Sequence, residues 1–229
     1  MLSFRFRLLL PFLLLGVHPS FAQEARDGFV DLFPKEGAPA GWSVREWNQL
    51  KTPVKEDVWT VKDGVLVSGP RRGTWLVSDA EYGDFTLEFE IKLGEHGNSG
   101  VALRAPMFGD PAFDGMELQV ADYRYNTSAK DSELTGGIYR AIAPSKQVYK
   151  PTEWNKFRVE LKGVHLKVTL NGEVIQDVDL DRYDQTVKRH DGSDAPPVKD
   201  RPRKGHIGFQ HLSSDQVPIL IRKARIKAD

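Results

Sequence analysis

The chain has 229 residues, of which 40% are hydrophobic and 28% are charged. This composition supports a packed core, is inconsistent with intrinsic disorder, and fits one large domain. Lys plus Arg and Asp plus Glu both number 32, so the excess positive charge typical of nucleic-acid-binding proteins is absent. There is no cysteine, which excludes disulfide bonds, thiolate metal ligands and cysteine nucleophiles.

The first 22 residues have the pattern of a secretory signal peptide. Arg5 and Arg7 precede an apolar run at 8–17, and Ser20-Phe21-Ala22 is a small-x-small cleavage motif. The apolar run is shorter than the ~20 residues that a membrane-spanning helix needs. We therefore expect cleavage after Ala22, export to the periplasm or the exterior, and a single mature domain over residues 23–229.

The mature chain alternates apolar and polar residues in many short segments, which is typical of antiparallel strands with one buried face. Residues 85–93, 157–161 and 166–170 show it most clearly. Asn171-Gly172 then precedes another such run at 174–180, and this dipeptide favours a two-residue hairpin. Further expected strands lie at 29–33, 58–61, 64–68, 74–78, 98–105, 115–122, 206–211 and 217–226. No helical pattern exceeds two turns, so the sequence predicts an all-β, two-sheet antiparallel sandwich.

One long segment, residues 181–204, breaks this pattern. It contains three prolines and twelve charged residues of both signs. Irregular segments of this length are commonly lids over a site or solvated excursions, and the sequence favours neither.

The segment 115–122 has an unusual outward face. Met116, Leu118 and Val120 form its apolar side, which places Glu117 and Gln119 on the opposite side, about 7 Å apart. Asp122 reaches that face only through a bulge, or it ends the strand.

Two other predicted strands supply neighbours for this face. The strand at 98–105 is connected to it by residues 106–114 and is expected to pair with it, directing Arg104 outward. In the strand at 206–211, Gln210 also faces out. The resulting candidate cluster consists of Arg104, Glu117, Gln119 and Gln210, edged by Asn98, Asp122 and His211. Polar outward residues are ordinary, but this set lacks lysine, and nearby glycines leave room for a ligand. We interpret the cluster as a candidate binding groove.

At these residues the sequence resembles the 3-keto-disaccharide hydrolase domain family, over residues 28–227. The motifs that carry the resemblance are F-x-x-L-F at 29–33, W-x-x-x-D-G-x-L at 59–66, Y-G-D-F at 82–85, N-S-G-V-x-x-R at 98–104, G-x-E-x-Q-x-x-D at 115–122, T-G-G-I-Y at 135–139, E-W-N at 153–155, L-N-G at 170–172 and G-x-I-G-x-Q at 205–210. Their order and spacing together are specific. The chain departs from the family pattern at His211, which follows Gln210 directly, and at 221–223, where F-R-N is replaced by I-R-K.

The resemblance implies a concanavalin A-like or laminin G-like jelly roll with a sugar-sized groove. It also implies an exported enzyme that acts on glycosides already oxidised at C3 by a partner dehydrogenase. A C3 ketone acidifies the C2 hydrogen, so a base can remove that proton, the enolate can expel the C1 substituent, and water can then add.

For this chemistry we assign Glu117 as the base. Arg104 is expected to stabilise the enolate oxygen, with a divalent cation of the Ca or Mn type as a possible cofactor. Asp122 would orient Arg104, ligate the metal or act as the acid. The substrate hydroxyls would be held by Asn98, Gln119, Tyr139, Gln210 and His211.

Two alternatives stay open. Laminarinase-type glycoside hydrolases carry E-x-D-x-x-E on a similar sandwich, but here Gln119 and Asp122 replace the second and third acids, which weakens a retaining pair. A non-catalytic carbohydrate-binding module is the other alternative, and an exposed Trp in the groove would favour it. Trp42, Trp59 and Trp154 are expected in the core, whereas Trp47 and Trp75 are unassigned.

Overall fold

The computed structural model describes residues 27–229. The predicted signal peptide, residues 1–22, lies outside this part of the chain. Among the helices of residues 27–229, none is long and apolar enough to span a membrane.

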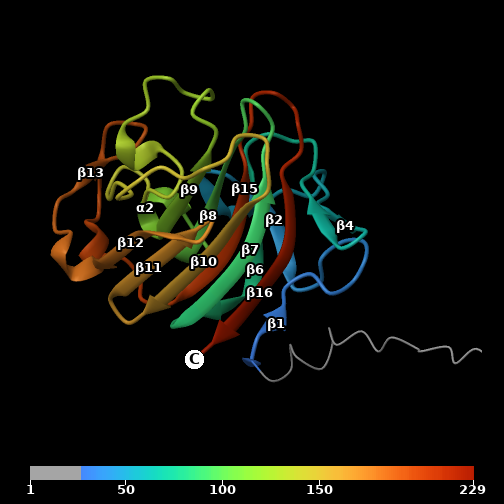
Figure 1. Cartoon of the computed structure of the whole chain (residues 1–229), viewed down its shortest axis with the longest axis horizontal. Coiled ribbons are helices and arrows are strands. Elements are labelled where there is room, and N and C mark those ends of the chain that lie inside the picture. The colour runs from blue at the N-terminus through green and yellow to red at the C-terminus, as the bar shows by residue number, and fades with distance from the viewer. Residues whose placement is uncertain (1–26) are drawn as a thin grey trace, which may run out of the picture.

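Two antiparallel sheets stack face to face (Figure 1). The eight-stranded sheet has the order β12-β11-β10-β7-β16-β5-β4, with β1 paired to β16. Its strands are β1 (Val30–Asp31), β4 (Thr60–Lys62), β5 (Val65–Val67), β7 (Phe85–Lys92), β10 (Asn155–Lys162), β11 (His165–Leu170), β12 (Glu173–Asp179) and β16 (Leu220–Ala228).

The six-stranded sheet has the order β3-β2-β6-β15-β8-β9. Its strands are β2 (Trp42–Glu46), β3 (Gln49–Pro53), β6 (Thr74–Tyr82), β8 (Asn98–Ala105), β9 (Met116–Ala121) and β15 (Gly205–His211). The predicted all-β, two-sheet sandwich is confirmed, and each predicted strand segment overlaps a strand of the structure. Neither β2 nor β3 was predicted from the sequence. Leu50 is the one fully buried residue among their ten positions, so these strands lack the regularly alternating buried side that identified the others.

The core lies between the sheets and is built by the inward halves of the alternating strands. Phe89 of β7 stacks on Phe157 of β10, with ring centroids 5.0 Å apart, and it meets the edge of Phe209 from β15 at 5.5 Å. All three rings are buried, and each contributes about 1.5–3 kcal/mol by leaving water. Phe209 belongs to the six-stranded sheet, so this contact joins the two layers.

The hairpin between β11 and β12 forms where the dipeptide predicted it. Asn171 has φ = 52° and Gly172 has φ = 90°. A two-residue turn of the primed type needs a positive φ at both central positions, which Asn and Gly tolerate best.

The irregular segment 181–204 forms a wall that is held at three buried residues, Ala195, Val198 and Arg201, while most of its other residues are exposed. It forms a small hairpin, β13 (Val187–Lys188) and β14 (Asp194–Ala195), followed by a 3-10 turn, η3 (Val198–Asp200). It lies near the loop that follows β9, at the upper left of Figure 1.

This wall is fixed to a short helix, α2 (Pro111–Asp114), in the connection between β8 and β9. Arg189 makes two hydrogen bonds to the Asp114 carboxylate, at 2.6 and 3.0 Å. Arg201 is buried and donates to the carbonyls of Ala112 and Gly115. These contacts hold the 181–204 segment against one end of the six-stranded sheet.

Candidate functional site

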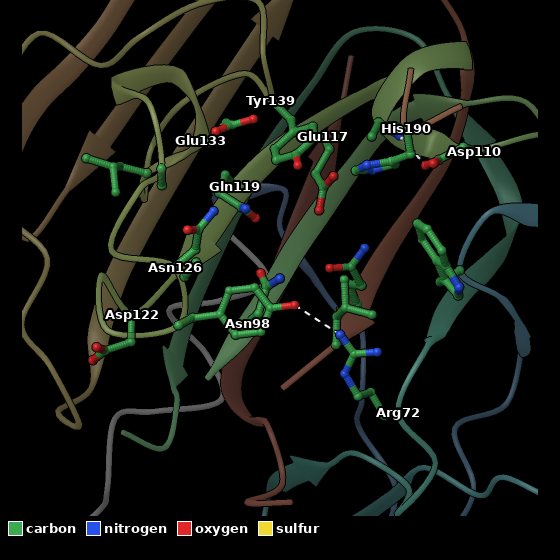
Figure 2. A pocket seen from close by; sticks show the side chains of 18 residues that line it. Arg72, Asn98, Asp110, Glu117, Gln119, Asp122, Asn126, Glu133, Tyr139 and His190 are labelled. Atoms are coloured by element: carbon green, nitrogen blue, oxygen red, sulfur yellow. Dashed lines mark hydrogen bonds between the residues drawn. The ribbon is translucent and has the colours of Figure 1, made fainter. Parts of the chain in front are cut away.

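A pocket of about 230 Å³ lies on the face of the six-stranded sheet that points away from the core (Figure 2). Its floor comes from β8, β9 and β15, and its walls come from the loop after β9 and from the 181–204 segment. Ligand pockets usually start at about 300 Å³, so this one suits a small ligand of the size of a single sugar ring.

Glu117 occupies the floor because a glycine leaves space for it. On the neighbouring strand β8, a Cβ atom at Gly100 would lie 2.0 Å from Glu117 Oε1. The side chain is 4% exposed, and within residues 27–229 its carboxyl has neither an ion-pair nor a hydrogen-bond partner. Burial raises the pKa of Glu117 well above its ordinary value, and the charge of Asp110 adds to the effect. A carboxyl with a raised pKa is a stronger base than an ordinary glutamate.

Three amide side chains lie beside Glu117 on the same floor. Gln119 follows it by two residues on β9, Asn98 comes from β8, and Gln210 comes from β15. Each is at most 5% exposed. Asn98 Oδ1 and Gln210 Oε1 are buried and have no protein hydrogen-bond partner in the described residues. Because buried polar atoms are normally paired, these two amides are placed to bind a polar ligand.

An aromatic group closes the end of the pocket around Glu117. The ring of His190, from the 181–204 segment, lies 5.9 Å from that of Tyr139, 5.3 Å from Phe113 and 5.6 Å from Trp47. Burial, together with Arg140, lowers the pKa of His190, so this ring is neutral at pH 7. Burial raises the pKa of Tyr139 to about 12, so its hydroxyl stays protonated and can donate a hydrogen bond.

Asp110 lies at the same end of the pocket, beyond His190 in Figure 2. It is the N-cap of α2, and its Oδ1 accepts a hydrogen bond from Ala112 N at 3.0 Å. The sequence Asp110-Pro111 explains the position, since Asp favours the N-cap and Pro the first helical residue. Burial raises the pKa of Asp110 to about 6.

The opposite end of the pocket is crossed by a single hydrogen bond. Arg72 Nη2, from the loop before β6, donates to the Tyr125 hydroxyl at 3.0 Å (Figure 2). Both residues line the pocket. They lie 53 residues apart in the chain, so this bond links the loop before β6 to the loop after β9.

Six of the eight predicted site residues line this pocket: Asn98, Glu117, Gln119, Asp122, Tyr139 and Gln210. Asp122 is at its margin, and its carboxylate points away from Glu117 (Figure 2). Its two oxygens accept from Nε and Nη2 of Arg124, at 2.7 and 2.8 Å. This ion pair leaves Asp122 poorly suited to the predicted roles of acid or metal ligand.

The predicted placement of Arg104 in the groove is wrong. Arg104 sits in a β-bulge, where the pairing of β8 with β15 shifts by one residue, and its φ is 51°. Its fully buried guanidinium donates to Gly83 O, Gly163 O and Asp84 Oδ1, at 2.7–2.9 Å. The bulge therefore redirects the side chain to the turns that connect β6 to β7 and β10 to β11, and alternation alone does not reveal it.

The predicted substrate contact at His211 is also wrong. His211 continues the inward alternation of Ile207 and Phe209 on β15, is 1% exposed and does not line the pocket. Its direct succession to Gln210 places it on the opposite side of the strand.

Seven polar or aromatic residues that line the pocket were not predicted from the sequence: Trp47, Arg72, Asp110, Tyr125, Asn126, Glu133 and His190. Asp110 carries a detectable signal, because Gly-Asp-Pro marks a helix start. The others lie in loops whose spatial position has no periodic signature. Of the tryptophans, Trp59 is buried as predicted, Trp75 is also buried, and Trp154 is half-buried beneath Arg222.

The divalent cation proposed from the sequence as a cofactor finds few charged ligands in this pocket. In the described part of the chain, no group of three or more Asp, Glu or His side chains is placed to hold a metal ion. The Asp122 oxygens are bonded to Arg124, and Glu117 is the one carboxyl among the amides of the pocket floor, whereas calcium affinity rises with the number of charged ligands.

Several solved structures share this fold. A candidate glycosyl hydrolase from Parabacteroides distasonis is 28% identical, with a TM-score of 0.71, covering 88% of this chain and 99% of that one. A second from the same organism is 25% identical, with a TM-score of 0.68 and coverages of 90% and 96%. LamAcat from Zobellia galactanivorans, at 13% identity, a TM-score of 0.52 and coverages of 89% and 99%, shares the fold alone.

No functionally curated protein matches the sequence. The family comparison is more specific, because the model of the 3-keto-alpha-glucoside-1,2-lyase-like domain matches residues 28–227. That range includes both sheets, the pocket floor and the 181–204 wall. The resemblance identified from the sequence motifs is confirmed, and the chain belongs to the 3-keto-alpha-glucoside-1,2-lyase-like domain family.

Proposed function

We propose that this protein cleaves the glycosidic bond of 3-keto-glycosides by elimination and then hydrates the product. The observation that carries the proposal is Glu117, a buried carboxyl that has no ion-pair or hydrogen-bond partner in residues 27–229 and lies on the floor of a pocket of the size of a sugar ring. Its raised pKa suits a base that takes a proton from carbon at neutral pH.

The first step uses the acidity that the C3 ketone gives to the C2 hydrogen. The Glu117 carboxylate takes the C2 proton, and the electron pair of that C–H bond forms the enolate. The enolate then re-forms the ketone and expels the C1 substituent with its bonding electrons, leaving a C1–C2 double bond. Addition of water across this bond, with oxygen at C1 and a proton at C2, completes the hydrolysis.

The developing negative charge on the C3 oxygen needs a hydrogen-bond donor. Arg104 cannot supply one, because its guanidinium lies outside the pocket and donates to Gly83, Gly163 and Asp84. We assign this role to the Tyr139 hydroxyl, which lines the same end of the pocket and stays protonated at neutral pH. The amides of Asn98, Gln119 and Gln210 would bind the remaining sugar oxygens, and Trp47 offers a ring for stacking.

The substrate would come from a partner dehydrogenase that oxidises a glycoside at C3. Export through the predicted signal peptide would place the enzyme in the periplasm or outside the cell. Both statements rest on the sequence and on the family to which the chain belongs.

The test compares a glucoside with its 3-keto derivative, with and without EDTA, and follows release of the C1 substituent. We expect cleavage of the keto substrate alone, no effect of EDTA, and loss of turnover in Glu117→Gln. Cleavage of the unoxidised glucoside would instead favour a direct glycoside hydrolase.

A sugar-binding module without activity is a second candidate, and the position of Trp47 at the pocket favours it. Binding of both sugars without cleavage of either would support this candidate and contradict the elimination mechanism.

A further inference from the structure

A second carboxyl, Asp110, shares the pocket with Glu117 and is not explained by the roles assigned so far. It lies in the connection between β8 and β9, 8% exposed, at the end of the pocket where Glu117, Tyr139 and His190 gather (Figure 2). The elimination described above still lacks a group that protonates the leaving oxygen.

Within residues 27–229, Asp110 forms no ion pair with an arginine, although three arginines lie near it. Each of the three is engaged elsewhere: Arg189 with Asp114, Arg140 with Glu133, and Arg201 with the carbonyls of Ala112, Gly115 and Pro196. In residues 27–229 Asp110 forms no ion pair, in contrast to Asp122 at the other margin of the pocket. The absence of a bound cation is compatible with a carboxyl that holds and releases a proton.

The backbone fixes one oxygen of this carboxyl and leaves the other without a protein partner. Oδ1 accepts from Ala112 N at 3.0 Å, and the backbone amide of Asp110 itself donates to Asp114 Oδ2 at 2.9 Å. For Oδ2 of Asp110 the described residues provide no hydrogen bond. The side chain is therefore oriented by the helix cap, while one oxygen stays available.

We propose that Asp110 is the general acid of the elimination and the general base of the hydration. This inference rests on the proposed function. As Glu117 takes the C2 proton, the Asp110 carboxylic acid gives its proton to the oxygen leaving C1, and the C1–O bond breaks. In the second half, the Asp110 carboxylate takes a proton from water as its oxygen bonds to C1, while Glu117 returns a proton to C2. Both carboxyls end in their starting states.

The test exploits the leaving group. A methyl 3-keto-α-glucoside must protonate its departing methoxide, whereas a 4-nitrophenyl 3-keto-α-glucoside releases a stable phenolate without help. Asp110→Asn keeps the cap, because the Asn Oδ1 atom can accept from Ala112 N, but it cannot deliver the proton. In single-turnover assays we expect a loss of about 10²–10⁴-fold on the methyl substrate and a change of only a few fold on the nitrophenyl substrate.

Two further variants make the result specific. Asp110→Ser also supplies a capping oxygen and replaces Asp110→Asn if the latter does not fold, as judged by circular dichroism. The matched control is Asp179→Asn, which changes another N-cap aspartate whose side chain accepts from Asp181 N at 3.0 Å, outside the pocket. We expect this control to cleave both substrates at the wild-type rate.

The possible failures are distinguishable. An equal loss on both substrates, or no loss on either, would overturn the assignment of Asp110 while leaving elimination by Glu117 intact. If the wild-type protein cleaves neither 3-keto substrate, the proposed function fails, and the assignment of Asp110 fails with it.

Discussion

Two outward-facing surfaces of the sandwich have similar sequence patterns and opposite electrostatics. On the eight-stranded sheet, Glu88 and Glu90 of β7 alternate with core residues, as Glu117 and Gln119 do on β9. Glu88 pairs with Arg158 and Arg225, and Glu90 pairs with two other cations of β16. Burial alone would raise the pKa of Glu88, but these hydrogen bonds and charges outweigh it and lower the pKa.

Glu117 has no such cation, so burial dominates and its pKa is raised. The difference comes from what faces each carboxylate across the strands. On the eight-stranded sheet the cross-strand partners of Glu88 and Glu90 are arginines and a lysine, whereas on the six-stranded sheet the partners of 117 and 119 are Ala102 and Gly100. Cross-strand partners, and not outward orientation, decide whether a carboxyl of this sandwich is paired with a cation.

The largest effect is expected for Glu117→Gln. The substitution preserves the shape of the side chain but removes the base, so we expect turnover of a 3-keto-glycoside to fall about 10²–10⁴-fold. Glu88→Gln is the matched control, because it changes a similar residue on the other sheet, and its rate should stay at the wild-type level. Steady-state kinetics on both variants measure this difference, and comparable losses in both would contradict the account.

Arg104→Met should damage stability rather than catalysis. The variant removes the hydrogen bonds from the buried guanidinium to Gly83 O, Gly163 O and Asp84 Oδ1, and a hydrogen bond of a charged group contributes about 1.5–3 kcal/mol. We expect a lower midpoint of urea unfolding and a near-normal rate per folded molecule. A large loss of rate in fully folded protein would contradict this structural role and indicate that Arg104 acts in catalysis.

The two glutamates also predict opposite dependences of stability on pH. The raised pKa of Glu117 penalises folding once pH exceeds the unfolded value near 4.5, so Glu117→Gln should be more stable than wild type at pH 7–8 and equal to it near pH 4.

The lowered pKa of Glu88 stabilises the fold above that value, and this contribution is lost as pH falls through the folded pKa. Glu88→Gln should therefore be less stable at pH 7 by about 1 kcal/mol, and the deficit should disappear in acid. Urea unfolding of both variants across pH 4–8 checks the pair, and differences of the same sign would contradict the comparison.

The smallest effect is expected at the bond between Arg72 and Tyr125. Tyr125→Phe keeps the ring and removes the hydroxyl that accepts from Arg72. A net hydrogen bond contributes about 0.5–1.5 kcal/mol, so we expect KM to rise about 2–10-fold while kcat changes little. An unchanged KM would show that the bond does not help to retain the substrate.

Much of the fold was predictable from local patterns. The alternation at 85–93 and 157–161 predicted two core strands. Asn171-Gly172 predicted the turn that joins β11 to β12 in the same sheet. The face with Glu117 and Gln119 followed from the same period of two. Arg104 could not be placed, because a bulge shifts the alternation by one residue without a local sequence signal. His190 is held at the pocket by long-range contacts, among them the pairing of its neighbour Arg189 with Asp114, 75 positions away.

The central claim is that Glu117 removes and returns a proton at C2. The most direct measurement is cleavage of a 3-keto-glycoside by the wild-type protein in D2O, with NMR of the released 3-keto sugar and with Glu117→Gln as the control for spontaneous exchange. Elimination and hydration predict solvent deuterium at C2 of the product, together with slower cleavage of a substrate that carries deuterium at C2. A product that retains its original C2 hydrogen, formed at the same rate from the C2-hydrogen and C2-deuterium substrates, would show direct hydrolysis at C1 and contradict the account.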